Sequence, residues 1–236
     1  MRLITLNLLQ GKMKEPLADF LKKYADKTDI FLFQEMPEAD GNGKSGLASD
    51  EIKNILSDFR NYSKSFSMNG GHLDDLSIFI KRGINVGESG EVETYDANIQ
   101  NDGTVYAWRD LGYVVIDGRK LIANFHGFWD RPDKFDRPRR IEQSRKVKAF
   151  LDKHDSPKIL AGDFNLWPET KSLKMLEKNM INLIDKYGVK STRPPNWKFL
   201  NKFSDYIFVS SDIKINDFRV LPDIVSDHLA LYLDFD

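Results

Sequence analysis

Short apolar runs that end in polar residues recur along the chain. Residues 30–33, Ile-Phe-Leu-Phe, are followed at once by Gln34 and Glu35. A continuous apolar run of this length is typical of a strand that is covered on both faces. Further strands are predicted at residues 3–8, 75–81, 105–108, 113–116, 121–125, 158–161, 205–209, 215–220 and 229–235. The expected core therefore consists largely of short buried strands.

Helical periodicity separates several of these strands. Residues 15–24 carry apolar side chains at helical spacing just after Pro16, and Ser49 is expected to cap a second helix. Two later helices are predicted, with apolar sides formed by Ile141, Val147, Phe150 and Leu151 in one and by Leu173 and Leu176 in the other. Asp117-Gly118 predicts a hairpin turn. Because strands and helices do not alternate strictly, the pattern favours an α/β fold of two packed sheets with helices outside.

Composition limits the function classes. The 236 residues are 41% hydrophobic and 12% aromatic, so we expect one domain, 1–236, with a sizeable core. With 35 basic and 36 acidic residues the net charge is −1, so any contact with nucleic acid must be local. The absence of cysteine excludes disulfides, thiolate metal sites and cysteine nucleophiles. No secretory leader and no membrane span is predicted, and a cytoplasmic monomer is expected.

Polar side chains stand where predicted strands end. Residues 158–161 lead through Gly162 to Asp163 and Asn165, and residues two apart in an extended chain point to the same side. A carboxylate at the end of an apolar strand needs a charged or hydrogen-bonding partner. The other members of the set are Asn7, Glu35, His126, Asp205, Asp227 and His228.

Each of these residues alone has a structural explanation. An Asp or Asn after a strand is usually a turn residue or a helix cap, and a His there is more often structural than catalytic. Together, carboxylates, amides and imidazoles are the groups expected around a hard cation such as Mg²⁺ or Mn²⁺. Such an ion polarises a phosphoryl oxygen while a histidine or an acid deprotonates water. The predicted chemistry is phosphoester hydrolysis.

Five segments of the chain resemble, in order, the motif series of the endonuclease/exonuclease/phosphatase superfamily. They are Gln34-Glu35, Phe125-His126, Gly-Asp-Phe-Asn at 162–165, Ser-Asp-Tyr-Ile at 204–207 and Ser-Asp-His at 226–228. The superfamily contains DNase I-like nucleases, abasic-site endonucleases, neutral sphingomyelinases, inositol polyphosphate phosphatases and deadenylases. The resemblance extends from Asn7 to His228. It implies a four-layer α/β sandwich with two central mixed β-sheets flanked by helices, and an active site along one edge of the sheets.

The resemblance also implies a set of metal ligands. Glu35 resembles the principal ligand, with Asn7 beside it and Asp227 near the metal. Many nuclease members carry an acid or amide two residues after the first Asn, where this chain has Leu9. The resemblance therefore leaves the residue that would make the second metal contact unassigned.

Further roles follow from the same resemblance. Asp163 and Asn165 would position the attacking water and the phosphate. His228 would contact the phosphate and transfer a proton, with Asp205 orienting its ring. His126 resembles the second histidine of the DNase I and sphingomyelinase branches.

Arg109 resembles a phosphate-binding arginine. One further detail of this site is left open by the sequence. The acid that would orient His126 is not identified. Asp74 and Asp75 lie in the right region of the sequence, but a turn role fits them equally well, and the backbone could hold the ring instead.

Other sequence features carry less weight. Residues 41–45 imitate part of a phosphate-binding loop, but Glu38 occupies the position of its first glycine. The basic residues after His126, including Arg131 and Lys134, could guide a phosphate backbone, yet interleaved acids favour a salt-bridged helix face. Trp129 and Trp167 directly follow site motifs and could stack on bases, although core packing is the default role of Trp.

Three functional hypotheses follow. The first is a metal-dependent hydrolase of phosphodiesters, with nucleic acid, DNA or RNA, as the substrate. The second keeps the same site but directs it at a small phosphorylated compound or a lipid headgroup, which the near-neutral charge favours. The third is a non-catalytic binding module on the same fold, against which the complete set of site residues argues.

Overall fold

The fold is built around two six-stranded β-sheets. The computed structural model describes residues 1–37, 46–62, 66–68, 71–73, 76–94, 110–129 and 133–236, and all statements below concern these residues. The first sheet has the order β13-β14-β1-β2-β6-β3 and the second the order β11-β12-β10-β9-β8-β7, with β4 and β5 as a separate pair. Parallel pairing joins β1 to β2 and β9 to β10, while their other neighbours are antiparallel. Both sheets are therefore mixed, as predicted.

The strands are short. Those of the first sheet are β1 (Arg2–Asn7), β2 (Ile30–Gln34), β3 (Phe59–Asn61), β6 (Leu76–Lys81), β13 (Ile215–Val220) and β14 (Leu231–Phe235). Those of the second sheet are β7 (Val86–Val92), β8 (Leu111–Ile116), β9 (Lys120–His126), β10 (Lys158–Asp163), β11 (Ile181–Asn182) and β12 (Asp205–Val209). The separate pair is β4 (Phe66–Met68) and β5 (Gly71–Leu73).

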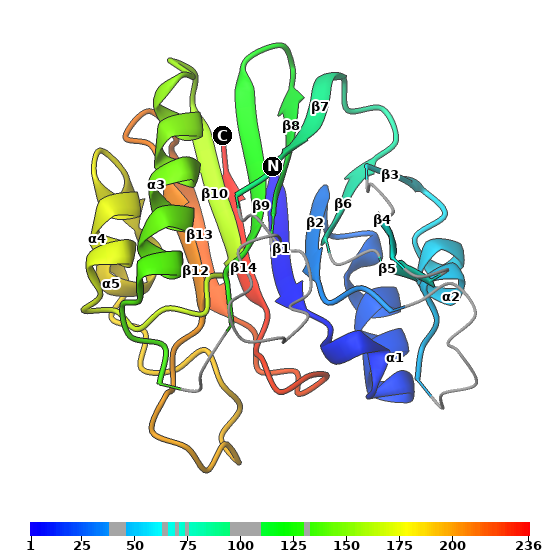
Figure 1. Cartoon of the computed structure of the whole chain (residues 1–236). Helices are drawn as coiled ribbons and strands as arrows, with labels where there is room; N and C mark the ends of the chain where they lie inside the picture. Colours follow the sequence, from blue (N-terminus) through cyan, green and yellow to red (C-terminus); the bar gives the residue numbers. More distant parts are fainter. Residues whose placement is uncertain (38–45, 63–65, 69–70, 74–75, 95–109, 130–132) are drawn as a thin grey trace.

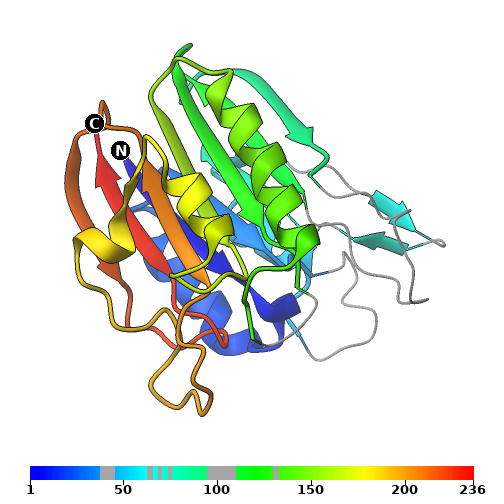
Figure 2. The ribbon, with the colours of Figure 1, turned by 60° about the vertical axis from the view of Figure 1, so that its left-hand side comes forward.

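Helices cover the outer faces of both sheets. The helices are α1 (Lys14–Ala25), α2 (Ser49–Ile55), α3 (Pro138–Asp152), α4 (Lys171–Glu177) and α5 (Leu183–Lys186), with a 3₁₀ turn at Leu9–Gly11. Figure 1 shows α1 and α2 on the side of the first sheet and α3, α4 and α5 on the side of the second. From the rotated view of Figure 2, α3 and α4 lie in front of the second sheet. The predicted four-layer α/β sandwich is confirmed.

The main core fills the space between the two sheets. It joins buried residues of the first sheet, among them Ile30 and Leu32, to Ile122, Leu160 and Ile207 of the second. A second buried cluster packs α1 and α2 against the outer face of the first sheet. Continuous apolar runs such as β2 are explained by this arrangement, because both faces of the strand are covered.

Most predicted elements are found with small shifts of their ends. Asp117 and Gly118 form the β8–β9 turn with positive φ values of 51° and 69°, as a hairpin turn of this kind requires. The prediction that Ser49 caps α2 is wrong, because Ala48 occupies the N-cap and Ser49 is the first helical residue. The Glu51 side chain instead accepts from the Ala48 N–H at 3.0 Å. The strand predicted at 105–108 lies outside the described residues.

The buried face of α3 differs from the predicted one. Ile141 and Phe150 are only partly buried, whereas Arg140 and Gln143 are buried. Arg140 Nε donates to the Phe128 carbonyl at 3.2 Å, and Gln143 Oε1 accepts from the Phe128 N–H at 2.7 Å. The helix therefore uses buried polar groups to satisfy the backbone of the segment that follows β9.

Candidate active site

Strand register brings the predicted polar residues together. In the second sheet, Asp163 pairs with His126 of β9 on one side and with Asp205 of β12 on the other. In the first sheet, Asn7 pairs with Gln34, the residue before Glu35. Figure 1 shows β1 running toward the end of the molecule where the loop before β12 projects. The site thus lies where β1, β2, β9 and β10 end and where β12 begins.

Asn7 connects the two sheets. Its Nδ2 donates to Glu35 Oε1 at 3.1 Å and to Asp163 Oδ2 at 3.0 Å, while its Oδ1 accepts from the Leu9 N–H at 2.9 Å. The Asn7 side chain is completely buried. One amide therefore holds the carboxylates of Glu35 and Asp163 side by side, although they belong to segments that are far apart in sequence.

Two buried amide side chains, Gln34 of the first sheet and Asn124 of the second, form a hydrogen bond between the sheets. Gln34 Nε2 donates to Asn124 Oδ1 at 2.6 Å and to Thr5 Oγ1 at 3.2 Å. Asn124 Nδ2 donates in turn to the carbonyls of Phe33 at 2.9 Å and Ser77 at 3.1 Å. Because unpaired amides are costly in an apolar core, this network favours one alignment of the two sheets.

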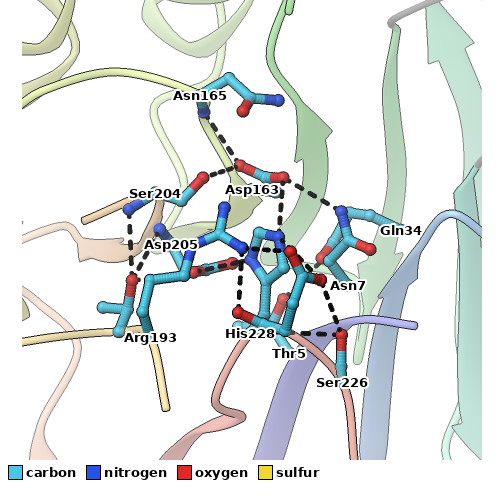
Figure 3. A network of polar contacts seen from close by, with 12 residues as sticks. Thr5, Asn7, Gln34, Asp163, Asn165, Arg193, Ser204, Asp205, Ser226 and His228 are labelled. Carbon is cyan, nitrogen blue, oxygen red and sulfur yellow. Dashed lines mark hydrogen bonds and ion pairs between the residues drawn. The ribbon is translucent and has the colours of Figure 1, made fainter. Parts of the chain in front are cut away.

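Asp163 is the centre of the site. Besides Asn7, it accepts from the Asn165 N–H at 3.0 Å and from the Ser204 hydroxyl (Figure 3). Burial alone would raise the pKa of Asp163, but the neighbouring His228, His126 and Lys134 hold it well below its usual range. Asp163 is therefore ionised at neutral pH.

The backbone around Asp163 is tightly constrained. Gly162 has a φ of +142°, and a Cβ added there would lie 2.0 Å from the Phe125 carbonyl oxygen. Asn165 has a φ of 51°, which turns the chain so that its own N–H reaches Asp163 Oδ1. Its Nδ2 donates to the Gly127 carbonyl at 3.1 Å. Asp163 and Asn165 are thus side by side as predicted, but a turn rather than an extended chain places them.

His228 and Asp205 form a buried pair. The Nδ1 of His228 lies 2.8 Å from Asp205 Oδ1, and Asp205 Oδ2 accepts from the Thr192 hydroxyl at 2.8 Å. The Nε2 of His228 lies 3.7 Å from Asp163 Oδ2 and 3.8 Å from Asp227 Oδ1. Burial alone would lower the pKa of His228, but Asp205 and Asp163 raise it above its usual value. Asp205 therefore orients the ring and favours its protonated form.

His126 also lies beside Asp163. Its ring is completely buried, and its Nε2 is 3.8 Å from Asp163 Oδ2. The two histidines thus approach the same carboxylate oxygen from different strands. Asp74 and Asp75, considered as partners for this ring, lie outside the described residues, as does Arg109.

Two basic residues that the sequence prediction did not assign complete the site. Arg193 Nη1 donates to Asp227 Oδ2 at 2.7 Å and to the Asp227 carbonyl at 2.9 Å, and the guanidinium lies 4.4 Å from the centre of the Trp197 ring. Lys134 Nζ donates to Ser204 Oγ at 2.7 Å and is almost fully buried. Burial lowers the pKa of Lys134 to about 8.

The sequence offered only a weak sign of these two residues. Lys134 belonged to the basic run after His126, and a salt-bridged helix face was favoured there. For Arg137 that interpretation agrees with the structure, because it contacts Asp133, whereas Arg140 also contacts Asp133 but is buried. For Lys134 it is wrong, because this side chain turns inward to Ser204. No pattern in the sequence marks Arg193.

The donor set fits a divalent cation. Asp163, Asp205 and His228 offer ligand atoms within 4.8 Å of one another. Most of the oxygen atoms of Asp163 and Asp205 already accept hydrogen bonds, whereas Glu35 is half-buried and lines the cavity. Carboxylate oxygens are the ligands that Mg²⁺ and Mn²⁺ prefer. Glu35, Asp163 and Asp227 line the same cavity, and Asn7 donates to both Glu35 and Asp163.

A cavity of about 1010 Å³ opens over these residues. We call its polar base the floor: Glu35, Asp163, Asn165, Asp227 and His228. Its wall is formed by Leu9, Trp129, Asp133, Lys134, Phe135, Trp167, Arg193, Trp197, Lys198, Phe199, Leu200 and Asn201. Among the described residues, every helix is too short or too polar to span a lipid bilayer.

Comparison with known proteins identifies the family and the fold. The model of the endonuclease/exonuclease/phosphatase family matches residues 4–228. The sequence has no match among curated proteins. The fold is similar to that of a mannosyl-6-phosphatase from Bacteroides thetaiotaomicron, with a TM-score of 0.76 and 17% identity over 100% of this chain and 99% of the other.

Two further structures share the fold. The human Nocturnin catalytic domain has a TM-score of 0.68 and 16% identity, over 100% of this chain and 93% of the other. TDP2 from C. elegans has a TM-score of 0.67 and 18% identity, over 99% of this chain and 74% of the other. At such identities the likeness concerns the fold, while the family model covers nearly the whole sequence. The chain therefore belongs to the endonuclease/exonuclease/phosphatase family.

Proposed function

We propose that this protein is a divalent-metal-dependent phosphoesterase and that hydrolysis takes place on the floor of the cavity. Members of its family are phosphoester hydrolases. The observation that supports the proposal most is the contact of one carboxylate, Asp163, with groups from both sheets. Asn7 and both histidines meet its Oδ2 atom, while Asn165 and Ser204 bind Oδ1. A structural carboxylate does not need two histidines and an open cavity above it.

Each residue of the floor has a proposed task. Ionised Asp163 positions the attacking water by accepting a hydrogen bond from it, and Asn165 binds the phosphate. His228, held by Asp205, binds a phosphoryl oxygen and transfers a proton. Glu35, with Asn7 and Asp227, would hold Mg²⁺ or Mn²⁺, which would neutralise charge that develops on the phosphoryl group.

The proposed substrate is a phosphodiester in nucleic acid. Two observations support a second candidate, a small phosphorylated compound: the cavity has about 1010 Å³, the size of a site for a small molecule, and a structurally similar protein is named a mannosyl-6-phosphatase. A lipid headgroup would be recognised by the same floor. The three substrates differ in what lies beyond the phosphate.

A substrate panel separates these candidates. Purified protein would be offered single-stranded and duplex DNA, RNA, sugar phosphates and phospholipid headgroups, each with Mg²⁺, with Mn²⁺ and with EDTA. Turnover that requires the metal and is lost in Asp163→Asn supports the proposal. Ligand binding without turnover under every metal would instead identify a binding module and overturn it.

A further inference from the structure

Exposed apolar side chains concentrate around the cavity. Among the described residues, six large hydrophobic side chains are exposed, and four of them line this one cavity. These four are Trp129, Phe135, Phe199 and Leu200, with exposed fractions of 48%, 55%, 65% and 90%. The other two, Tyr187 and Ile224, do not line it. Contiguous exposed apolar surface of this kind marks a binding site.

The apolar wall is mostly aromatic. We define the aromatic rim as Trp129, Phe135, Trp167, Trp197 and Phe199, all of which line the cavity. They come from the segments that follow β9 and β10 and from the loop that precedes β12. Trp197 and Phe199 are held in an edge-to-face contact, with ring centres 5.1 Å apart. Ring faces and edges are suited to a planar aromatic partner, which they contact by stacking.

The rim is continuous with the floor through Arg193. The guanidinium of Arg193 donates to Asp227 on the floor and also lies over the Trp197 ring of the rim. A ligand whose phosphate reaches the floor therefore places its organic part against the rings. Three positively charged side chains of the wall, Lys134 and Arg193, which are buried, and Lys198, which is exposed, complement the negative charge of a phosphate group.

We propose that the aromatic rim is a subsite for a planar aromatic ring carried by the phosphoester substrate. The ring is a nucleobase or another aryl group attached close to the phosphate. This inference rests on the proposed function, because the phosphate is taken to bind at the floor. It adds a specificity determinant that lies outside the strand-end residues.

Matched ligands isolate the contribution of the ring. Adenosine 5′-monophosphate and ribose 5-phosphate share the same phosphate and ribose and differ only in the base. In titration calorimetry with Mg²⁺ present, on the full chain carrying Asp163→Asn to prevent turnover, we expect the nucleotide to bind about tenfold more tightly. Equal affinities would overturn the subsite. A comparison of phenyl phosphate with methyl phosphate distinguishes a nucleobase from another aryl group. If phenyl phosphate binds about tenfold more tightly than methyl phosphate, the subsite accepts any aryl group. If the two bind equally, the subsite requires the nucleoside.

Rim variants locate the effect. Phe199→Ala removes an exposed ring and should abolish most of the preference for the nucleotide, while the affinity for ribose 5-phosphate changes less than about twofold. Ile224→Ala, an exposed apolar side chain away from the cavity, is the matched control and should keep the full preference. A Phe199→Ala protein that keeps the preference, or weakens both ligands equally, contradicts a ring subsite.

The outcomes separate this inference from the proposed function. Metal-dependent turnover of phosphoesters without any preference for rings would leave the function intact and overturn the rim proposal. A ring preference in binding without turnover of any phosphoester would support the rim and overturn the phosphoesterase assignment.

Discussion

The floor of the cavity and its aromatic rim are built in opposite ways. The floor is anchored to strand ends: Asp163 is 2% exposed and accepts from three side-chain or backbone donors. The rim is carried by loops, and Phe199 in it is 65% exposed. Sheet register determines the geometry of the floor, whereas loop composition determines what the rim can bind. Chemistry and substrate selection therefore reside in parts of the chain that can vary independently.

The largest expected effect concerns proton transfer on the floor. His228→Gln should lower kcat by about 10²–10⁴-fold on any substrate that the wild type hydrolyses, because the group that transfers the proton is lost. Steady-state kinetics on folded protein measures this loss. His154→Gln is the matched control, since His154 lies just after α3, away from the cavity lining, and contacts the Phe150 carbonyl. A loss below tenfold for His228→Gln would show that His228 is not the proton-transfer group.

The next prediction concerns the backbone that holds Asp163. Gly162→Ala should lower the free energy of unfolding by at least ~2 kcal/mol, because the new Cβ meets the Phe125 carbonyl and the φ is unfavourable. Gly118→Ala is the control for φ alone, since Gly118 has a φ of +69° and open space around it. It should cost about 1 kcal/mol. Equal losses in urea unfolding would show that the close approach to β9 has no energetic weight.

This contrast explains what could be predicted from the sequence. His126 and Asp163 each end a run with a strong strand pattern, Asp205 begins such a run, and the family resemblance singled out all three as site residues. Their mutual contacts required only that neighbouring strands pair in register. The two-sheet architecture was predicted from the lack of strict alternation between strands and helices and from the family resemblance.

The residues that were missed depend on contacts between distant segments. Lys134 reaches Ser204, 70 residues away, and Arg193 reaches Asp227, 34 residues away. Neither residue lies in a periodic segment, so no pattern distinguishes it from a solvated surface charge. Asn124 stands in an apolar strand, and its partner Gln34 belongs to the other sheet. Such pairs become visible only when the packing of the sheets is known.

A smaller effect is expected where the wall meets the floor. Lys134→Met removes the donor to Ser204, whose hydroxyl binds Asp163, and should lower kcat about tenfold through loss of a charged hydrogen bond. Lys198→Met removes the same charge from an exposed position on the cavity wall and should have little effect on kcat. Similar losses in both variants would mean that only the net charge of the wall matters.

Lys134 also predicts a pH dependence of stability. The pKa of Lys134 is lowered to about 8 from 10.5, so the unfolded chain binds more protons between these values. The cost of burying the charge is present below pH 8 and is relieved as the pH rises toward 10.5. This contribution should raise the free energy of unfolding of the wild type in urea between pH 7 and pH 9.5, and Lys134→Met should lack the increase. An identical pH response in both proteins would contradict a buried charged lysine.

The smallest expected change is in the pKa of His228 itself. Asp205→Asn removes the nearest negative charge while burial remains, so the pKa of His228 should fall in imidazole NMR titrations of the metal-free protein. In the wild type this pKa is raised, so the stability from the His228–Asp205 pair is complete below the unfolded value of 6.5. It is lost as the pH rises through the folded value, because His228 then becomes neutral in the folded protein. Asp205→Asn should flatten this part of the stability profile, whereas Phe199→Ala on the rim should leave it unchanged. If the rim variant altered the titration of His228 as much as Asp205→Asn does, the floor and the rim would be one coupled unit rather than two.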